Sequence, residues 1–480
     1  MRTYSAKNEK EASPFQQTPR LPAALPDRPE AVQTIARVTQ TLKSRRKFDG
    51  PRREAGLFAK ANHAQWIELR SRRGGIQMKP AFACALAASL SLTAAALADD
   101  KVVKIGVLTD LSGLYADITG PGSMLAAQMA AEDIGLREKG WTIDVTSGDH
   151  QNKPDVGAGI ARKWFDQEKI DVIVDVPNSG VGLAVSAVVK EKNGVFLIAG
   201  AATSDLTDKA CTPNNVHWTF DTYALANGTG KEVVKTGGDT WFFVTADYAF
   251  GQALQRDTSA VVEANGGKVL GSVKAPLNTP DFSSYLLQAQ ASKAKVIGLA
   301  NAGGDTMNSI KQAHEFGITR AGVKLAALLL FISDVNALGL DVAQGLQFTE
   351  TFYWDMNEGT RAFAKRFSER MKNHAEPTMV QAGVYASLIH YFKALEALGG
   401  NPHDGAKVVA QMKEIPTDDP LFGKGMIRID GRAIHPAYLF EVKSPAESKY
   451  PWDYYKLVAT IPADEAFRPL AQSQCPLVKK

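Results

Sequence analysis

The chain is 480 residues long, of which 45% are hydrophobic and 22% charged, and its formal net charge is +4. Residues 1–98 hold 17 Lys and Arg against 7 Asp and Glu, so this segment carries +10 and the remainder carries −6. The basic balance therefore belongs to the N-terminal segment. Beyond it, the sequence has no basic stripe interleaved with aromatic residues, which argues against nucleic-acid binding.

The first 98 residues divide into two segments. Residues 1–77 are rich in Pro, Arg, Gln and Ala, a composition that predicts disorder. Residues 78–98 combine a basic start at Met78-Lys79, a short apolar run and the small-residue site Ala96-Leu97-Ala98, the pattern of a secretory signal peptide. Because such a signal acts at the N-terminus, we interpret Met78 as the start of translation, with Met1 as the alternative, and expect a periplasmic protein.

The remaining ~380 residues exceed the usual size of one domain, which favours two. No apolar stretch after Ala98 reaches the roughly 18–20 residues of a membrane span.

Strands and helices are expected to alternate from residue 101 onward. The segment 102–108 is a continuous apolar run, as in a strand buried on both faces of a parallel sheet. A first series predicts strands at 102–108, 142–146, 171–176 and 195–199, with helices at 121–136, 154–167 and 181–192. A second predicts strands at 241–245, 268–274, 296–300 and 323–330, with helices at 225–235, 251–264, 282–292 and 306–316.

The C-terminal part differs in its pattern. After a strand at 347–351, the sequence predicts helices at 360–373, 379–398 and 405–414, and then an antiparallel hairpin of 437–443 with 454–460. Two β-α series imply parallel sheets with right-handed crossovers. The predicted fold class is therefore α/β, with two similar doubly wound lobes.

Motifs of enzymes and of bound cofactors are missing from the sequence. There is no phosphate-binding P-loop, no Gly-x-Ser-x-Gly and no zinc-type spacing of Cys or His. We therefore expect a protein that is not an enzyme and needs no cofactor.

Loops rich in Gly, Ser and Thr follow successive predicted strands. They cover 109–122, 177–182, 200–206 and 301–306. In an open α/β sheet these edges form the ligand crevice, and helix N-termini there can receive a carboxylate. The hydroxyls of Ser179 and Thr203 would complete such a cradle. Taken singly, each residue is equally explained by ordinary capping of a helix.

Aromatic residues gather near the same loops. Rings suit the walls of a site for an apolar or aromatic ligand, although a single aromatic residue is more often part of the core. The candidates are Tyr115, Trp218, Tyr223, Tyr248 and Phe331, with Tyr353 and Trp354 further on.

Two cysteines remain outside the predicted signal, which itself contains Cys84. In an oxidising compartment Cys211 and Cys475 are expected to form one disulfide, which would tie the C-terminal tail to the first lobe. The alternative is two unpaired thiols.

Four segments carry a resemblance to a known family. They are Lys104-Ile-Gly-Val-Leu-Thr-Asp-Leu-Ser-Gly113, Pro177-Asn-Ser-Gly180, Gly200-Ala-Ala-Thr-Ser-Asp-Leu-Thr207 and Asp247-Tyr-Ala-Phe-Gly251. From about Lys101 to the C-terminus, the chain resembles the type I periplasmic binding proteins of the branched-chain amino acid receptor family, which serve ABC importers.

The resemblance implies two Rossmann-like lobes joined by three hinge crossovers, placed near Phe220, Phe352 and Phe440. Lobe 1 would comprise 99–220 and 353–440, and lobe 2 would comprise 221–352 and 441–480 with the tail. In such receptors the ligand carboxylate lies against positions matched here by Ser179, Gly180, Ala201 and Thr203, and the second-lobe tyrosine matches Tyr248. With the neighbouring loop residues, the expected ligand-binding set is Tyr115, Asn178, Ser179, Gly180, Ala201, Thr203, Tyr248, Asn301, Asp305 and Phe331.

One position departs from the family pattern. Phe331 stands where amino acid receptors place the acid that holds the ligand's ammonium, and burying an ammonium without a carboxylate is costly. Asp305 or Asp334 remains as an alternative partner for that charge.

A branch of the family is more similar still, through 111–117, 150–155, 216–219, 299–306 and the Cys-Pro-Leu-Val-Lys-Lys terminus. Some of its members take up aromatic carboxylates. The resemblance therefore implies a monomeric receptor that delivers a small organic carboxylate, an aromatic acid, to the permease subunits of an ABC importer. The alternative ligand is a branched-chain or other neutral amino acid.

Overall fold

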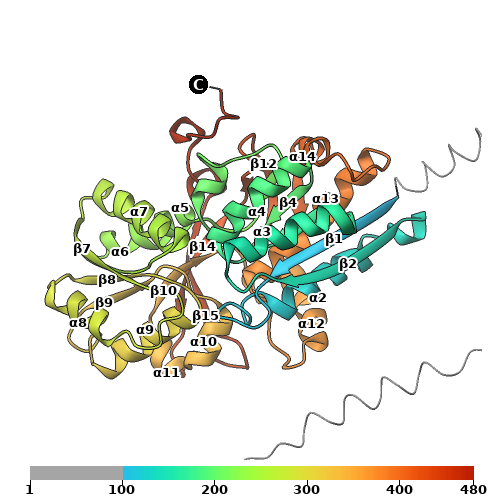
Figure 1. Cartoon of the computed structure of the whole chain (residues 1–480). Coiled ribbons are helices and arrows are strands. Elements are labelled where there is room, and N and C mark those ends of the chain that lie inside the picture. Colours follow the sequence, from blue (N-terminus) through green and yellow to red (C-terminus); the bar gives the residue numbers. More distant parts are fainter. Residues whose placement is uncertain (1–100, 480) are drawn as a thin grey trace, which may run out of the picture. The chain divides into compact units, whose positions relative to one another are not determined.

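The computed structural model describes residues 101–479, so the predicted extension and signal peptide lie outside the described residues (Figure 1). Within the described part, no helix combines the length and the apolar character needed to cross a bilayer.

Lobe 1 is built on a parallel five-stranded sheet with the order β2-β1-β3-β4-β5. Its strands are β1 (Val102–Thr109), β2 (Thr142–Asp149), β3 (Val172–Asp175), β4 (Val195–Ile198) and β5 (Asn215–His217). Alternate residues of the central strands face two apolar clusters, one on each side of the sheet. This two-sided burial explains why β1, β3 and β4 are almost continuously apolar.

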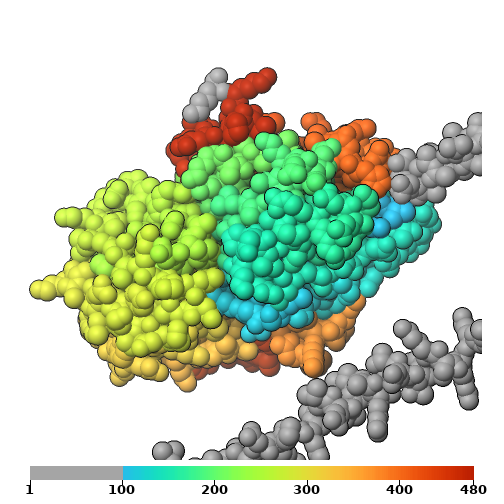
Figure 2. Space-filling model, viewed as in Figure 1, coloured from blue at the N-terminus to red at the C-terminus, as the bar shows by residue number. Residues whose placement is uncertain are grey.

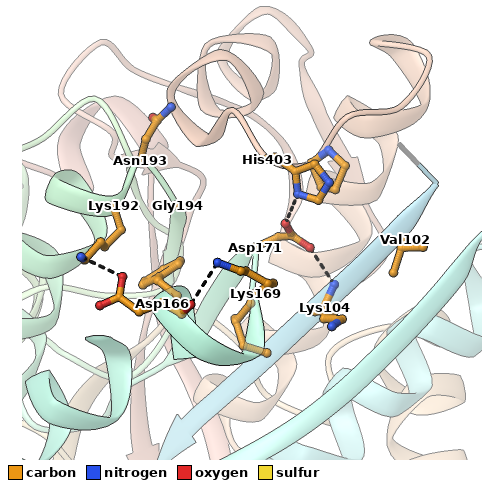
Figure 3. Close-up of a pocket in the computed structure, with 12 residues that line it drawn as sticks. Val102, Lys104, Asp166, Lys169, Asp171, Lys192, Asn193, Gly194 and His403 are labelled. Carbon is orange, nitrogen blue, oxygen red and sulfur yellow. Dashed lines mark hydrogen bonds and ion pairs between the residues drawn. The ribbon is translucent and has the colours of Figure 1, made fainter. Parts of the chain in front are cut away.

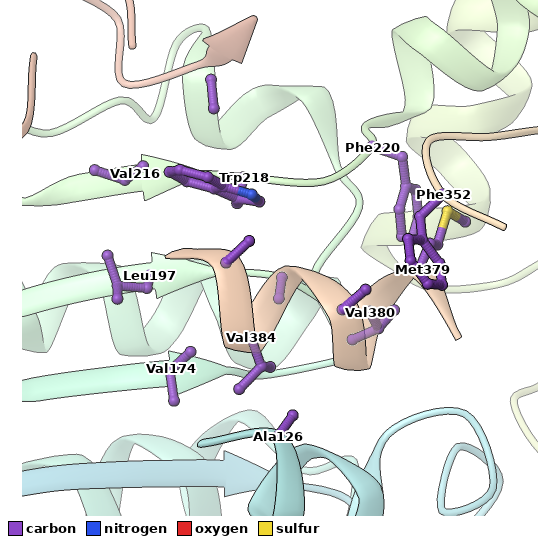
Figure 4. Packing of buried hydrophobic residues seen from close by; sticks show 14 of the residues in the cluster. Ala126, Val174, Leu197, Val216, Trp218, Phe220, Phe352, Met379, Val380 and Val384 are labelled. Atoms are coloured by element: carbon purple, nitrogen blue, oxygen red, sulfur yellow. The ribbon is translucent and has the colours of Figure 1, made fainter. Parts of the chain in front are cut away.

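Helices cover both faces of this sheet. On one face lie α3 (Pro154–Lys163) and α4 (Ser179–Lys192), and on the other α2 (Gly120–Asp133) and α13 (Met379–Ala397). In Figure 4, Val380 and Val384 of α13 point to the same cluster as Val174 and Leu197 of the strands. Two further helices of lobe 1 are α12 (Glu358–Arg370) and α14 (Gly405–Glu414).

Lobe 2 repeats the same topology in a parallel four-stranded sheet with the order β7-β6-β8-β9. Its strands are β6 (Thr240–Ala246), β7 (Lys268–Ala275), β8 (Val296–Ala300) and β9 (Lys324–Ala327). Its helices are α5 (Thr222–Leu225), α6 (Lys231–Lys235), α7 (Ala249–Ala264), α8 (Ser283–Ala291), α9 (Gly304–Glu315), α10 (Ile332–Leu338) and α11 (Leu340–Ala343). In both sheets the strand order reverses beside the first strand, where doubly wound folds bind ligands.

A third sheet is antiparallel, with the order β10-β14-β15. Its strands are β10 (Gln347–Glu350), β14 (Ala437–Val442) and β15 (Tyr455–Ile461), and the last two confirm the predicted hairpin. Phe440 lies inside β14, so the lobe boundary predicted there falls within a strand of this sheet. The exact lobe bounds remain a prediction.

The fold has the predicted class, with two doubly wound lobes joined by three crossovers. The chain passes to lobe 2 after β5, returns to lobe 1 after β10, and passes again to the third sheet before β14. After β15 the tail runs through α15 (Ala463–Ala466) to lobe 1, where Cys475 forms the predicted disulfide with Cys211.

Several elements differ from the prediction. β9 ends at Ala327, although the predicted strand continued to Leu330. Residues 328–330 are buried but do not pair with β8. Apolar character reports burial rather than strand pairing. The predicted helix 225–235 is interrupted by a π-type turn at Ala226–Gly230. The sequence prediction also missed β5, α10 and the small sheet of β11 (Thr417–Asp419), β12 (Gly423–Ile427) and β13 (Ala433–Ile434).

Candidate functional site

The two lobes enclose a small cavity of about 20 Å³ at the carboxyl edges of their sheets. On the face shown in Figure 2, the yellow-green surface of lobe 2 abuts the teal surface of lobe 1. The cavity is lined by Tyr115, Ile118, Thr119, Pro177, Gly200, Ala202, Phe220, Tyr248, Phe250, Ala302, Leu329, Phe331 and Val380. Many of them belong to one apolar cluster that continues from lobe 1 into lobe 2.

Two tyrosines join the lobes across this cavity. The hydroxyl oxygens of Tyr115 and Tyr248 lie 2.5 Å apart, and burial raises the pKa of both phenols. Both phenols therefore keep their protons, of which one lies in the bond between them and the other remains able to be donated. Asp110 holds the loop of Tyr115 by accepting hydrogen bonds from the backbone N–H of Gly113 and of Tyr115, at 2.7 and 2.9 Å.

The lobes also approach closely at Gly303, which precedes α9 with φ +57°. A Cβ at this position would stand 2.8 Å from the carbonyl oxygen of Leu114 and 3.1 Å from the ring of Tyr115. Glycine is needed here both for the left-handed backbone and for the contact between lobes.

Phe331 forms part of an aromatic wall. Its ring meets Phe220 edge-on, with the centroids 6.0 Å apart, and Phe220 belongs to the first crossover. The backbone N–H of Phe331 donates to Asp334 at 3.1 Å, which fixes the start of α10. Burial raises the pKa of Asp334 to about 7.

The predicted carboxylate cradle lies beside the cavity, and many of its groups are already bonded to one another. Asn178 caps α4 by accepting from the N–H of Gly180 and of Val181, at 2.9 and 3.1 Å. Ser179 Oγ accepts from the N–H of Thr203 at 3.1 Å, and Thr203 Oγ1 accepts from Asp205 at 3.4 Å. In these bonds both hydroxyls act as acceptors.

The other predicted ligand-binding residues do not line the cavity. Ala201 packs in the cluster beneath α4, and its neighbour Ala202 lines the cavity instead. Asn301 accepts from Thr306 Oγ1 at 2.8 Å and donates to Ser309 Oγ at 3.0 Å. Asp305 accepts from the N–H groups of Asn278 and Thr279, and burial raises its pKa to about 6. Both therefore organise the loops around the site.

The structure thus brings Tyr115, Tyr248 and Phe331 together in the cavity wall. Sequence reasoning missed several lining residues, among them Ile118, Thr119 and Val380. Ile118 and Thr119 lie inside the Gly/Ser/Thr-rich loop 109–122. That loop was the sequence signal that could have identified them as lining residues. Val380 comes from α13, at least 160 residues away in the chain from the other lobe-1 lining residues, and no local pattern indicates its contact.

A larger pocket of about 520 Å³ lies at the opposite edge of the lobe-1 sheet (Figure 3). Its basic side chains already have protein partners. Lys192 pairs with Asp166 at 2.8 Å, Lys104 Nζ donates to the carbonyl of Glu168 at 3.1 Å, and His403 contacts Asp171 at 2.8 Å. Doubly wound folds bind ligands at the carboxyl edge, which favours the cavity between the lobes.

The described residues contain no cluster of three or more His, Cys, Asp or Glu side chains suited to a metal ion. The hydroxyls and rings in the wall of the cavity between the lobes are of the kinds that line sites for small organic molecules.

Known proteins share this architecture. The chain is 52% identical to a periplasmic binding protein of Burkholderia mallei, covering 79% of this chain and 100% of that one, with a TM-score of 0.76. It is 39% identical to a structure described as a branched chain amino acid ABC transporter periplasmic ligand-binding protein of Burkholderia xenovorans, covering 78% and 100%, with a TM-score of 0.70.

A solute-binding protein of an ABC transporter from R. palustris, in complex with 4-hydroxybenzoate, is 24% identical over 75% of this chain and 97% of that one. Its TM-score is 0.69, so this likeness concerns the fold. The family model described as "Periplasmic binding protein" matches residues 102–449. With its two lobes closed over one cavity, the chain belongs to the periplasmic binding protein family, and its fold is that of the type I members.

Proposed function

We propose that the protein is the extracytoplasmic receptor of an ABC importer and binds a small aromatic carboxylate between its lobes. The observation that carries this proposal is the chemistry of the cavity wall: of the described residues that line it, none has a charged side chain, and five are aromatic. Aromatic side chains suit a ring, and hydroxyls can donate to a carboxylate.

An α-ammonium group has no partner in this wall. Phe331 occupies the position expected for an acid, and burying a cation beside it without a carboxylate is unfavourable. Asp305 and Asp334 lie near the cavity but accept hydrogen bonds from the backbone. One hydroxyl of the Tyr115–Tyr248 pair and the hydroxyls of Ser179 and Thr203 can instead offer protons, which favour an anion.

The ligand would enter an open form. A cavity of about 20 Å³ is far smaller than the roughly 150 Å³ that accommodates benzene in a protein interior. The lobes therefore have to separate at the crossovers and close again around the ligand, as hinged binding proteins do. The closed form would be the one presented to the permease subunits. In this proposal the receptor is a monomer, is exported by residues 78–98 to the periplasm, and needs no cofactor.

A neutral or branched-chain amino acid is the second candidate, supported by the description of the 39%-identical Burkholderia xenovorans protein. Thermal unfolding of the full chain in the presence of aromatic acids or neutral amino acids distinguishes the two candidate ligands. A bound ligand raises the midpoint temperature of unfolding. Shifts with aromatic acids alone are expected. Shifts with leucine-like compounds alone would overturn the assignment.

Catalysis is not part of the proposal. Ligand recovered after prolonged incubation with the protein should be chemically unchanged by mass spectrometry. Conversion of the ligand would indicate an enzyme on the same fold.

A further inference from the structure

Asp175 ends β3 at the point where the strand order of lobe 1 reverses. It is fully buried, and both it and Val176 have positive φ angles, +85° and +59°. Such angles are unfavourable for residues other than glycine, and for a β-branched valine most of all. The chain therefore holds this carboxyl at the carboxyl edge of the sheet in a strained conformation, which is common at binding sites.

Within residues 101–479, neither carboxyl oxygen of Asp175 makes a well-formed hydrogen bond, although the hydroxyls of Thr109 and Ser123 face it. Other buried acids of this protein, in contrast, do accept hydrogen bonds. Asp305 accepts from two backbone N–H groups, and Asp171, at the other end of β3, contacts His403 and the N–H of Lys104. A buried carboxyl without a well-formed hydrogen bond is costly and needs an explanation.

The carboxyl lies directly behind the cavity wall. A Cβ on Gly200 would stand 2.9 Å from Asp175 Oδ1, and Gly200 lines the cavity together with Pro177. At this point only the backbone of Gly200, which has no side chain, lies between Asp175 and the cavity. The proposed cradle residues Ser179 and Thr203 follow in the same two loops, so a ligand carboxylate there would lie near Asp175.

The charges around Asp175 come from few groups. From β1, Thr109 faces it with a hydroxyl and the neighbouring Asp110 with a negative charge; from α2, Ser123 faces it with a hydroxyl. The loop residues Pro177 and Gly200 carry no charge. Burial raises the pKa of Asp175 to about 7, Asp110 raises it further, and the two hydroxyls act in the opposite direction.

We propose that Asp175 takes up a proton when a carboxylate binds in the cradle beside it, and that its protonation state thereby decides whether the site accepts an anionic ligand. This inference rests on the proposed function. Two anions this close repel each other, so binding of a carboxylate favours the neutral acid, which can also donate a hydrogen bond. The proton comes from solvent, and no covalent bond changes.

The test is isothermal titration calorimetry of the full chain with 4-hydroxybenzoate as the probe, between pH 6 and 8.5. At each pH, two buffers with different ionisation enthalpies report the protons taken up. At pH 8 and above we expect uptake approaching about one proton, and Kd rising up to about tenfold per pH unit.

Two variants assign the proton. Asp175→Asn should abolish the uptake and flatten the pH dependence of Kd. Asp171→Asn removes a buried acid from the other end of the same strand. This variant should retain both the proton uptake and the pH dependence of Kd. If Asp175→Asn does not fold, Asp175→Ser provides the same comparison.

The outcomes separate the two levels of the proposal. Binding of 4-hydroxybenzoate without proton uptake, or with uptake unchanged in Asp175→Asn, overturns the role of Asp175 and leaves the proposed function standing. Absence of binding by 4-hydroxybenzoate and benzoate at every pH, with leucine bound instead, overturns the proposed function and this role with it.

Discussion

Tyr115 of lobe 1 and Tyr248 of lobe 2 share a hydrogen bond of 2.5 Å between their hydroxyls, and both side chains line the cavity between the lobes. A bond of this kind exists only while the lobes are closed. It also joins the loop organised by Asp110 to the start of α7. Closure of the lobes and the shape of the cavity therefore depend on the same two side chains.

Replacing Tyr248 by Phe removes the hydroxyl and keeps the ring. We expect the ligand Kd to rise about 2- to 15-fold, since one hydrogen bond of the closed form, worth about 0.5–1.5 kcal/mol, is lost. Calorimetric titration measures the change. Tyr285→Phe, on the outer helix α8, serves as the matched control. Equal effects of the two substitutions would contradict a role for the Tyr115–Tyr248 bond.

Phe331→Glu introduces an acid into the aromatic wall. If this ring lines the site as proposed, binding of aromatic acids should weaken more than tenfold, because an added anion opposes the ligand carboxylate. Phe331→Leu keeps an apolar side chain and should weaken binding less. Fluorescence or calorimetric titration of both variants compares them, and unchanged affinity in Phe331→Glu would place the ligand elsewhere.

Thr203→Val removes a hydroxyl while keeping the branched shape. We expect it to weaken carboxylate binding by about 1–3 kcal/mol, the cost of leaving a buried polar partner unpaired. Thr203→Ser retains the hydroxyl and should bind nearly as well as the parent protein. An unchanged Kd in Thr203→Val would show that this hydroxyl does not contact the ligand.

The disulfide between Cys211 and Cys475 spans 264 residues of sequence. Its removal should lower the free energy of unfolding by at most about 5 kcal/mol in the chain-entropy model. Denaturant unfolding with and without reductant, and of Cys211→Ala/Cys475→Ala, measures this loss. Under denaturing, non-reducing conditions the full chain should show one reactive thiol, Cys84. Three reactive thiols would contradict the bond.

His150 should make stability depend on pH. Its Nδ1 accepts the N–H of Asn152 at 3.0 Å, and burial lowers its pKa to about 4. Because the folded pKa lies below that of the unfolded chain, the stabilisation is complete above about pH 6.5 and is lost as the pH falls toward 4.

The loss at pH 4 should reach up to about 3 kcal/mol, and His150→Asn should reduce the acid dependence of the unfolding free energy. His314→Asn, near the end of α9, is the control. If His150→Asn and the parent protein lose stability equally between pH 6.5 and 4, the linkage belongs to other groups.

The sequence by itself determined the two β-α series and the sheet edge at which the cavity between the lobes lies. Continuous apolar strands such as Val102–Thr109 require helices on both faces, and parallel strands bring the loops after them to a common edge. Tyr115, Tyr248 and Phe331 were therefore recognisable from their places after predicted strands. The pairing of Cys211 with Cys475 followed from the number of cysteines and the expected compartment.

Only the tertiary structure decided which groups face the cavity and which are occupied elsewhere. Val380 reaches the wall because α13 returns to the lobe-1 sheet from a distant part of the chain. Asn178 caps its own helix, and Asp175 is left without a well-formed hydrogen bond behind Gly200. Local patterns report periodicity and burial, whereas the direction and partners of a side chain depend on elements packed from far along the chain.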